Sequence, residues 1–249
     1  MAQLALVTGG AVRIGKAVAL RLAGEGYDIA LQFRNSSAEA EAAAAAIRAK
    51  GARAECFRAD LTKDEDVAAL IPAVNATLGC ASCLVNNASH FADDRLPALT
   101  PQGWDAHMAI NLKAPVFLAQ AFAAQLPADR CGNVINIIDQ RVLRPNPQFF
   151  SYTVSKSALW AATKTMAQAL APRIRVNAIG PGPALGSIYQ TPDDFERENR
   201  STLLGRGTTP DEIAKTVLLI LGTPAMTGQM IALDGGQHLL WQTPDIRVT

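Results

Sequence analysis

Residues 4–17 read LALVTGGAVRIGKA, and this stretch decides the fold. The run Leu4–Thr8 is short and apolar, which is typical of a buried parallel strand. A glycine-rich turn follows, and then a helical pattern that ends at Gly24. Glycines let a backbone approach a pyrophosphate, and a helix N-terminus offers free N–H groups, so this order predicts a dinucleotide site. The glycines stand at 9, 10 and 15, which is looser than G-x-G-x-x-G.

Apolar strands and helical segments alternate along the rest of the chain without a repeat or a linker. Further strands are predicted at 28–33, 52–59, 83–86, 134–138, 174–179 and 229–233. Further helices are predicted at 38–50, 62–78, 104–126, 151–170, 193–203 and 210–222. This alternation predicts a single doubly wound α/β domain, with a seven-stranded parallel sheet flanked by helices.

The composition excludes several classes of protein. The 249 residues are 49% hydrophobic and 18% charged, with a net charge of +1. Such a globular chain gives no sign of a nucleic-acid or membrane-surface partner, and no apolar run approaches the roughly 20 residues of a spanning helix. The N-terminus lacks the basic region of a signal peptide, so we expect a cytoplasmic protein. Cys80 and Cys83 form a lone C-x-x-C without a second pair, so no metal site is expected.

The residue after the second predicted strand distinguishes two cofactors. An acid there would bind the ribose 2′-hydroxyl of NAD, whereas Arg34 with Asn35 and Ser36 suits the 2′-phosphate of NADP. The sequence therefore favours NADP(H), and an exposed loop arginine is the alternative. Asp60, which ends the third strand beside Leu61, either accepts from an adenine amino group or caps a turn.

Tyr152 and Lys156 stand four residues apart in a predicted helix, so both side chains fall on one face. An ammonium group favours phenolate over phenol, so we expect the pKa of Tyr152 to fall and the phenol to act as an acid. Asp139 ends a β-branched run thirteen residues before the tyrosine and is aimed at the same place. Asn111 lies inside the helix predicted at 104–126, where we expect it to hold a backbone kink or a water, or to be a tolerated polar residue.

Taken together, these motifs resemble the short-chain dehydrogenase/reductase family over nearly the whole chain. The T-G-x-x-x-x-x-G turn, N-N-A at 86–88, the helix asparagine, Y-x-x-x-K and P-G at 181–182 occur in the family's order. The resemblance implies a Rossmann-type domain over residues 1–249 and a homotetramer. It also implies a catalytic tetrad of Asn111, Asp139, Tyr152 and Lys156. In that tetrad Tyr152 donates a proton, Lys156 holds the nicotinamide ribose and lowers the tyrosine pKa, and Asn111 keeps a water in a proton relay.

The polar, irregular segment around residues 184–207 stands where a lid over the site would lie. The resemblance further implies two sets of binding residues. The cofactor set comprises Gly9, Arg13, Ile14, Gly15, Arg34, Asn35, Ser36, Asp60, Leu61, Asn87, Ala88, Ser89, Tyr152, Lys156, Pro181 and Gly182. The substrate set comprises Arg13, Ser89, Phe91, Asp139 and Tyr152.

Asp139 departs from the family, which usually places a serine there. A serine donates and accepts, whereas a carboxylate only accepts unless it is protonated. The aspartate therefore argues against a simple ketone and favours a substrate with N–H groups or an imine nitrogen that needs a proton. The same departure occurs in the pteridine reductases and dihydromonapterin reductases, which the chain also resembles in Arg13, Ser89 and Phe91.

The sequence thus predicts an NADPH-dependent reductase that transfers hydride to a C=N bond of a pterin-like substrate. A flat heteroaromatic ring would lie between Phe91 and the nicotinamide, unless Phe91 is a core aromatic. Two other functions stay open. One is a short-chain carbonyl or 3-oxoacyl reductase that tolerates Asp139, and the other is an NADP-binding sensor with little catalysis. The apolar tail Leu239–Gln242 is expected to be covered in the tetramer or near a neighbouring site.

Overall fold

Seven parallel strands form one sheet in the order β3-β2-β1-β4-β5-β6-β7 in the computed structural model, which describes residues 3–242. The strands are β1 (Gln3–Val7), β2 (Tyr27–Phe33), β3 (Ala54–Arg58), β4 (Cys83–Asn86), β5 (Gly132–Ile137), β6 (Ile174–Pro181) and β7 (Met230–Leu233). The strand order reverses where β1 pairs with β4. In a doubly wound sheet, ligands bind beyond the carboxyl ends of the strands at such a point.

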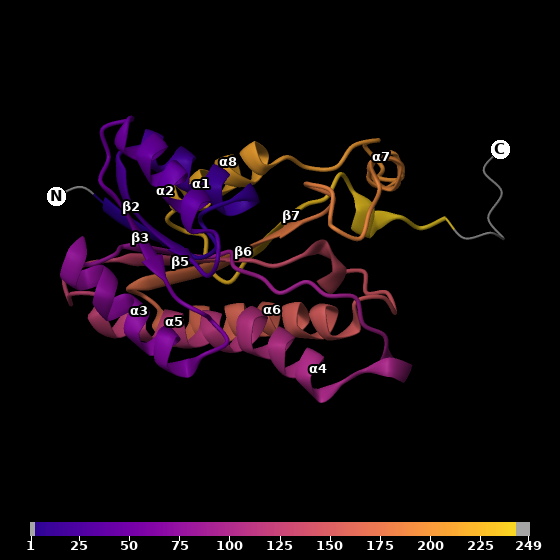
Figure 1. The fold of residues 1–249 in the computed structure, drawn as a ribbon, viewed down its shortest axis with the longest axis horizontal. Coiled ribbons are helices and arrows are strands. Elements are labelled where there is room, and N and C mark those ends of the chain that lie inside the picture. The colour runs from indigo at the N-terminus through magenta and orange to yellow at the C-terminus, as the bar shows by residue number, and fades with distance from the viewer. Residues whose placement is uncertain (1–2, 243–249) are drawn as a thin grey trace.

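Helices cover both faces of the sheet (Figure 1). One face carries α1 (Arg13–Gly24), α2 (Ser37–Arg48) and α8 (Pro210–Leu221). The other carries α3 (Asp64–Thr77), α4 (Pro101–Met108), α5 (Ala114–Gln125) and α6 (Phe150–Leu170). The short helix α7 (Pro192–Arg200) lies near one end of the molecule.

Two hydrophobic clusters fill the two layers. Ala5 and Val7 of β1 pack into the cluster under α1, whereas Leu4 and Leu6 pack into the cluster that contains α3 and α5. Successive side chains of a strand point to opposite faces, so an apolar run without alternation indicates a strand buried on both sides. The predicted sheet is therefore confirmed, and each predicted strand is present within a few residues of its expected bounds.

The helix predicted at 104–126 is divided. A π-helical turn, Ala109–Lys113, separates α4 from α5 and contains Asn111. Such turns interrupt the regular hydrogen-bond ladder and occur frequently at functional sites. The helix is therefore irregular at Asn111, where a backbone kink was one of the roles considered. The helix predicted at 193–203 is shorter in the structure, where α7 spans Pro192–Arg200.

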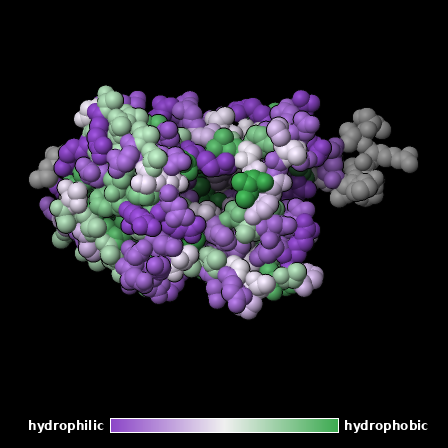
Figure 2. Space-filling view, in the orientation of Figure 1, coloured by the Kyte–Doolittle hydropathy of each residue, from purple (hydrophilic) through white to green (hydrophobic). Residues whose placement is uncertain are grey.

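Within residues 3–242, no helix combines the length and the hydropathy needed to span a membrane. The first two and the last seven residues of the predicted 1–249 domain lie outside the described residues. Hydrophobic residues gather around a hollow near the middle of the face seen in Figure 2, and hydrophilic residues surround it.

Candidate active site

A cavity of about 810 Å³ opens beyond the carboxyl ends of the central strands. Most of the predicted site residues line it: Gly9, Arg13, Ile14, Gly15, Asn87, Ala88, Ser89, Phe91, Asp139, Tyr152, Lys156, Pro181 and Gly182. The predicted residues Arg34, Asn35, Ser36, Asp60 and Leu61 follow β2 and β3 and are not part of its lining. Asn111 is fully buried behind the loop that follows β4.

Close packing explains the glycines of the first turn. A Cβ atom on Gly15 would lie 2.1 Å from the carbonyl oxygen of Gly9 and 2.6 Å from Nδ2 of Asn87. Gly9 has φ +60°, and a Cβ there would lie 3.1 Å from Cα of Ala88. Gln32, which the sequence reading missed, accepts a hydrogen bond from Gly9 N at 2.9 Å. The turn is therefore held between β2 and the loop after β4, with its backbone facing the cavity.

The start of α1 can hold an anion. Its first turn, Arg13-Ile14-Gly15-Lys16, contains no acidic residue, and the preceding Val12 carries no acceptor in its side chain. The first N–H groups of a helix lack partners within it and stand at the positive end of the helix dipole. Since residues 12–15 line the cavity, these groups suit a phosphate.

Arg13 reaches across the cavity to the loop after β6. Its guanidinium donates to the carbonyl oxygens of Gly186 at 3.1 Å and Leu185 at 3.3 Å. The backbone of Arg13 has φ +52°, which is an uncommon conformation for a residue other than glycine. The side chain therefore ties the first turn to residues 185–186, a connection that sequence spacing does not reveal.

Arg34 stands exposed at the end of β2. Its side chain is 51% exposed, and its guanidinium lies 4.0 Å from Oδ1 of Asp60. Asp60 Oδ1 accepts from the backbone N–H and the hydroxyl of Thr62, and the backbone hydrogen bond is the first cause that lowers the pKa of Asp60. Of the two roles considered for Asp60, the structure shows the turn cap. The exposed guanidinium has donors left for a phosphate.

The phenol of Tyr152 and the carboxyl of Asp139 are directly hydrogen-bonded. Tyr152 Oη donates to Asp139 Oδ2 at 2.9 Å, and the backbone N–H of Arg141 donates to Asp139 Oδ1 at 2.8 Å. Burial raises the pKa of Asp139 above its usual value. Burial, and then the neighbouring Asp139, raise the pKa of Tyr152 well above 10.0. The expected fall in the pKa of Tyr152 is therefore wrong, because burial and a carboxyl partner oppose ionisation of the phenol.

The ammonium group of Lys156 lies over the Tyr152 ring and hydrogen-bonds to the last residue of β5. Its ammonium nitrogen is 5.7 Å from the centre of the Tyr152 ring and donates to the carbonyl oxygen of Ile137 at 2.8 Å. The residue is 2% exposed, and burial lowers the pKa of Lys156 to about 8, against the opposing effect of Asp139. A lysine held in this way has two donors left for a ligand in the cavity.

Asn111 fastens the loop after β4 to α6. Its Oδ1 accepts from Ser89 Oγ at 3.1 Å and from His90 N at 2.8 Å. Its Nδ2 donates to His90 O at 2.9 Å and to Ser155 Oγ at 3.0 Å. All four hydrogen-bonding positions of the amide are thus used by protein groups. The water relay expected at Asn111 stays a prediction, and the side-chain amide has no position left for that water.

An aromatic cluster stands beside the phenol. The Phe91 ring stacks on Phe149 with centroids 4.2 Å apart and an interplanar angle of 12°, and it meets Tyr152 edge-on at 4.8 Å. Tyr189 lies 6.0 Å from Phe91 and 5.7 Å from Phe149. Phe91 therefore lines the cavity and is not a core residue. The sequence reading missed Phe149 and Tyr189, although the aromatic pair at 149–150 precedes Tyr152 by only two residues.

Three residues from separate segments meet at the outer end of the cavity. Glu198 of α7 accepts from Gln190 Nε2 at 2.6 Å and from Gln237 Nε2 at 3.2 Å. Gln190 belongs to the loop after β6, and Gln237 follows β7. All three line the cavity. No spacing in the sequence connects them, so only the fold reveals this cluster.

Comparisons with known proteins show relatives of similar sequence and solved structures of similar fold. Residues 10–238 match a family model described as Enoyl-(Acyl carrier protein) reductase. The 3-oxoacyl-(acyl-carrier-protein) reductase FabG of Staphylococcus epidermidis is 33% identical over 244 residues, which cover 96% of this chain and 100% of the relative. The solved structure of FolM Alternative dihydrofolate reductase 1 from Brucella suis in complex with NADP has 51% identity and a TM-score of 0.95, and 98% of each chain is covered. A blue fluorescent protein from a metagenomic library, in complex with NADPH, has 33% identity and a TM-score of 0.87, covering 94% of this chain and 97% of that one.

Proposed function

The chain belongs to the short-chain dehydrogenase/reductase family, and on this basis we propose that it is an NADPH-dependent reductase of a pterin-like substrate. The reaction would transfer hydride to the carbon of a C=N bond and a proton to its nitrogen. The single observation that carries this proposal is the hydrogen bond between Tyr152 and Asp139, a carboxyl whose pKa is raised by burial. A protonated carboxyl can donate to an imine nitrogen, as the reaction requires.

The cofactor half of the proposal rests on residues that fit a dinucleotide phosphate. The crowded glycine turn and the start of α1 suit the pyrophosphate, and the exposed Arg34 suits a 2′-phosphate. Lys156 has donors left for the nicotinamide ribose. Two of the similar solved structures are complexes with NADP and NADPH, which supports the same cofactor here. When bound, NADPH supplies the hydride.

The protein's own part in the chemistry is to hold and deliver one proton. Tyr152 Oη and Asp139 share a hydrogen bond, so a proton lost from the phenol to the substrate is replaced from the carboxyl side. The positive charge of Lys156 stabilises the negative charge that this transfer leaves behind. The face of Phe91 that does not stack on Phe149 would pack on a flat heteroaromatic ring next to the phenol.

The relatives support two candidate substrates. The FolM structure, at 51% identity, supports a pterin-type substrate. The FabG relatives, at 33% identity, support a 3-oxoacyl or other carbonyl substrate. Asp139 favours the first, because a carboxyl can accept from the N–H groups that a pterin presents, whereas a simple carbonyl substrate offers it no such donor.

Oxidation of NADPH by the purified protein tests the proposal. The assay offers 7,8-dihydrobiopterin and dihydromonapterin beside a panel of ketones and an acetoacetyl thioester, with NADH as the cofactor control. We expect turnover of a dihydropterin with NADPH. Turnover of the thioester or a ketone alone would establish the carbonyl reductase instead. Tight NADPH binding without turnover of any of these compounds would support the sensor.

Three further properties belong to the same proposal. Residues 184–207 would form a lid, which is supported by the bonds of Arg13 to residues 185–186 and by Glu198. A cytoplasmic homotetramer would cover the exposed side chains of Phe117, Leu239 and Trp241. Light scattering of the purified protein tests the tetramer, and a monomer would contradict it.

A further inference from the structure

The helix that carries the phenol begins without a capping side chain of its own. Phe149 stands at the N-cap position of α6, in the left-handed region at φ +52°, and a phenyl ring accepts no hydrogen bond from a helix N–H. The first N–H groups of any helix lack partners within that helix, so they must find them elsewhere.

Asp94 supplies two of these partners from a distant part of the chain. Its Oδ1 accepts from the backbone N–H of Ser151 at 2.9 Å, across a separation of 57 residues. Its backbone carbonyl oxygen accepts from the N–H of Phe150 at 3.2 Å. A carboxylate at a helix N-terminus is also favoured by the helix dipole. Asp94 therefore caps α6 although it lies in the loop after β4.

This loop carries side chains that face the candidate active site. Ser89 and Phe91 lie in it, and both line the cavity with Tyr152. Asn111 holds the loop at residues 89–90, and Asp94 holds it three residues beyond Phe91. Between these two attachments, the Phe91 ring contacts Phe149 and Tyr152, which stand at the start of α6. The cap thus joins the two segments whose rings meet.

We propose that Asp94 is a positioning residue of this site: its cap on α6 fixes the Phe91 ring against Tyr152 and so sets where a flat heteroaromatic substrate stacks. Two segments that are far apart in the sequence keep a ring contact in register only if their backbones are connected nearby. The Asp94 side chain provides that connection at the helix start. The identity of the substrate rests on the proposed function, whereas the effect of Asp94 on the loop does not.

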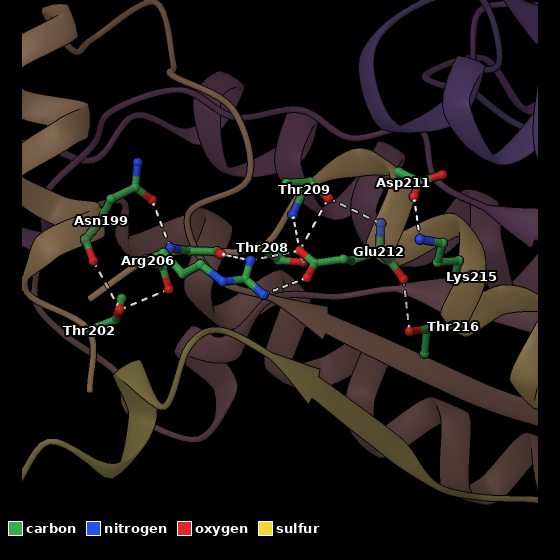
Figure 3. A network of polar contacts seen from close by, with 10 residues as sticks. Asn199, Thr202, Arg206, Thr208, Thr209, Asp211, Glu212, Lys215 and Thr216 are labelled. Atoms are coloured by element: carbon green, nitrogen blue, oxygen red, sulfur yellow. Dashed lines mark hydrogen bonds and ion pairs between the residues drawn. The ribbon is translucent and has the colours of Figure 1, made fainter. Parts of the chain in front are cut away.

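Substitutions at two helix caps separate positioning from stability. Asp94→Ala removes the side-chain acceptor, and Asp94→Asn keeps it. Thr209→Ala is the matched control, because Thr209 Oγ1 accepts from Glu212 N at 3.2 Å and caps α8 (Figure 3), which lies on the other face of the sheet (Figure 1). Loss of either cap is expected to lower Tm by about 3 °C. Thr209 does not line the cavity, so its loss leaves substrate binding unchanged.

The kinetic readout is the KM for dihydropterin beside the Kd for NADPH. We expect Asp94→Ala to raise KM about tenfold while the NADPH Kd changes less than twofold, because only the stacking ring moves. Asp94→Asn should stay within about threefold of the wild type. Asp94→Glu keeps the charge but moves the acceptor, so it should raise KM as well, and it replaces Asp94→Ala if that variant does not fold. If Asp94→Ala and Asp94→Glu lower Tm but leave the KM for dihydropterin unchanged, Asp94 is only a structural cap and the proposal is overturned.

A second readout does not depend on the substrate. Amide hydrogen exchange of residues 87–95 and 149–153 should be faster in Asp94→Ala than in the wild type and in Thr209→Ala. If the wild type reduces no dihydropterin, the proposed function fails but this exchange experiment still decides the role of Asp94. Unchanged exchange in the loop would overturn the positioning role whatever the substrate proves to be.

Discussion

Tyr152 Oη donates a hydrogen bond to Asp139 Oδ2 at 2.9 Å, so the phenol is the donor and the carboxyl the acceptor of the pair at this site. The carboxyl is in turn held by the backbone N–H of Arg141. Burial raises the pKa of both groups, and the ammonium nitrogen of Lys156 lies 5.7 Å from the centre of the Tyr152 ring. The raised pKa values favour the protonated forms of both groups, which is the property that the proposed reduction of a C=N bond requires.

Replacing the phenol should stop the reaction without releasing the cofactor. Tyr152→Phe keeps the ring against Phe91 but removes the only proton of the side chain that can be transferred. General acid catalysis contributes about 10²- to 10⁴-fold, so we expect kcat to fall by at least about 10²-fold. The Kd for NADPH, measured by fluorescence, should change less than about threefold. Turnover at the wild-type rate would show that Tyr152 is not the acid.

Asp139→Ser distinguishes the two candidate substrates. If the carboxyl delivers a proton to a nitrogen, dihydropterin reduction should fall about 10²-fold in this variant. A carbonyl reductase would keep or gain activity, because a serine hydroxyl can donate to a carbonyl oxygen. Asp139→Asn is the control, since it keeps the shape of the side chain without an acidic proton. Retained dihydropterin turnover in both variants would remove Asp139 from the mechanism.

The buried ammonium group of Lys156 should appear in the pH dependence of stability. Burial lowers the pKa of Lys156 to about 8 from 10.5, so the unfolded chain holds this proton more tightly than the folded one. The free energy of unfolding should therefore rise with pH between about 8 and 10.5, by about 3 kcal/mol over the whole interval. Below pH 8 the buried ammonium group of Lys156 lowers the free energy of unfolding by its full amount.

Urea unfolding of the wild type and of Lys156→Met at several pH values measures this effect. Only the difference between the two proteins is used, because tyrosine and cysteine also titrate in this range. The free energy of unfolding of the wild type minus that of Lys156→Met should rise by about 3 kcal/mol between pH 8 and pH 10.5. A difference that stays constant from pH 7 to pH 10 would contradict the lowered pKa.

Arg34 should determine the preference for NADPH over NADH. Its guanidinium is half exposed and lies 4.0 Å from the carboxyl of Asp60, so it is available to a 2′-phosphate. Arg34→Ala should weaken NADPH binding about tenfold or more and leave NADH binding unchanged, because NADH lacks that phosphate. Lys50→Ala, an exposed change of the same charge on the segment after α2, is the control. Equal losses for both cofactors would disprove this role.

The sequence determined the sheet and the first turn by local rules. An apolar run such as Leu4–Val7 is typical of a strand that is buried on both faces, and this was readable from hydropathy together with the glycine-rich turn that follows. The glycines at 9 and 15 were readable for the same reason, since no other residue permits the close backbone contacts seen there. The asparagine at 111 also predicted the interruption that separates α4 from α5.

The tertiary structure alone decided which groups these elements bring together. Residue spacing placed Lys156 near Tyr152 but predicted the wrong direction for the phenol's pKa, because the direction depends on burial and on Asp139 across the site. The cap of α6 by Asp94 and the stacking of Phe91 on Phe149 join segments separated by more than fifty residues. Periodicity describes the neighbours of a residue within its own element. Hydrogen-bond partners and desolvation depend on distances through space, which only the folded chain defines.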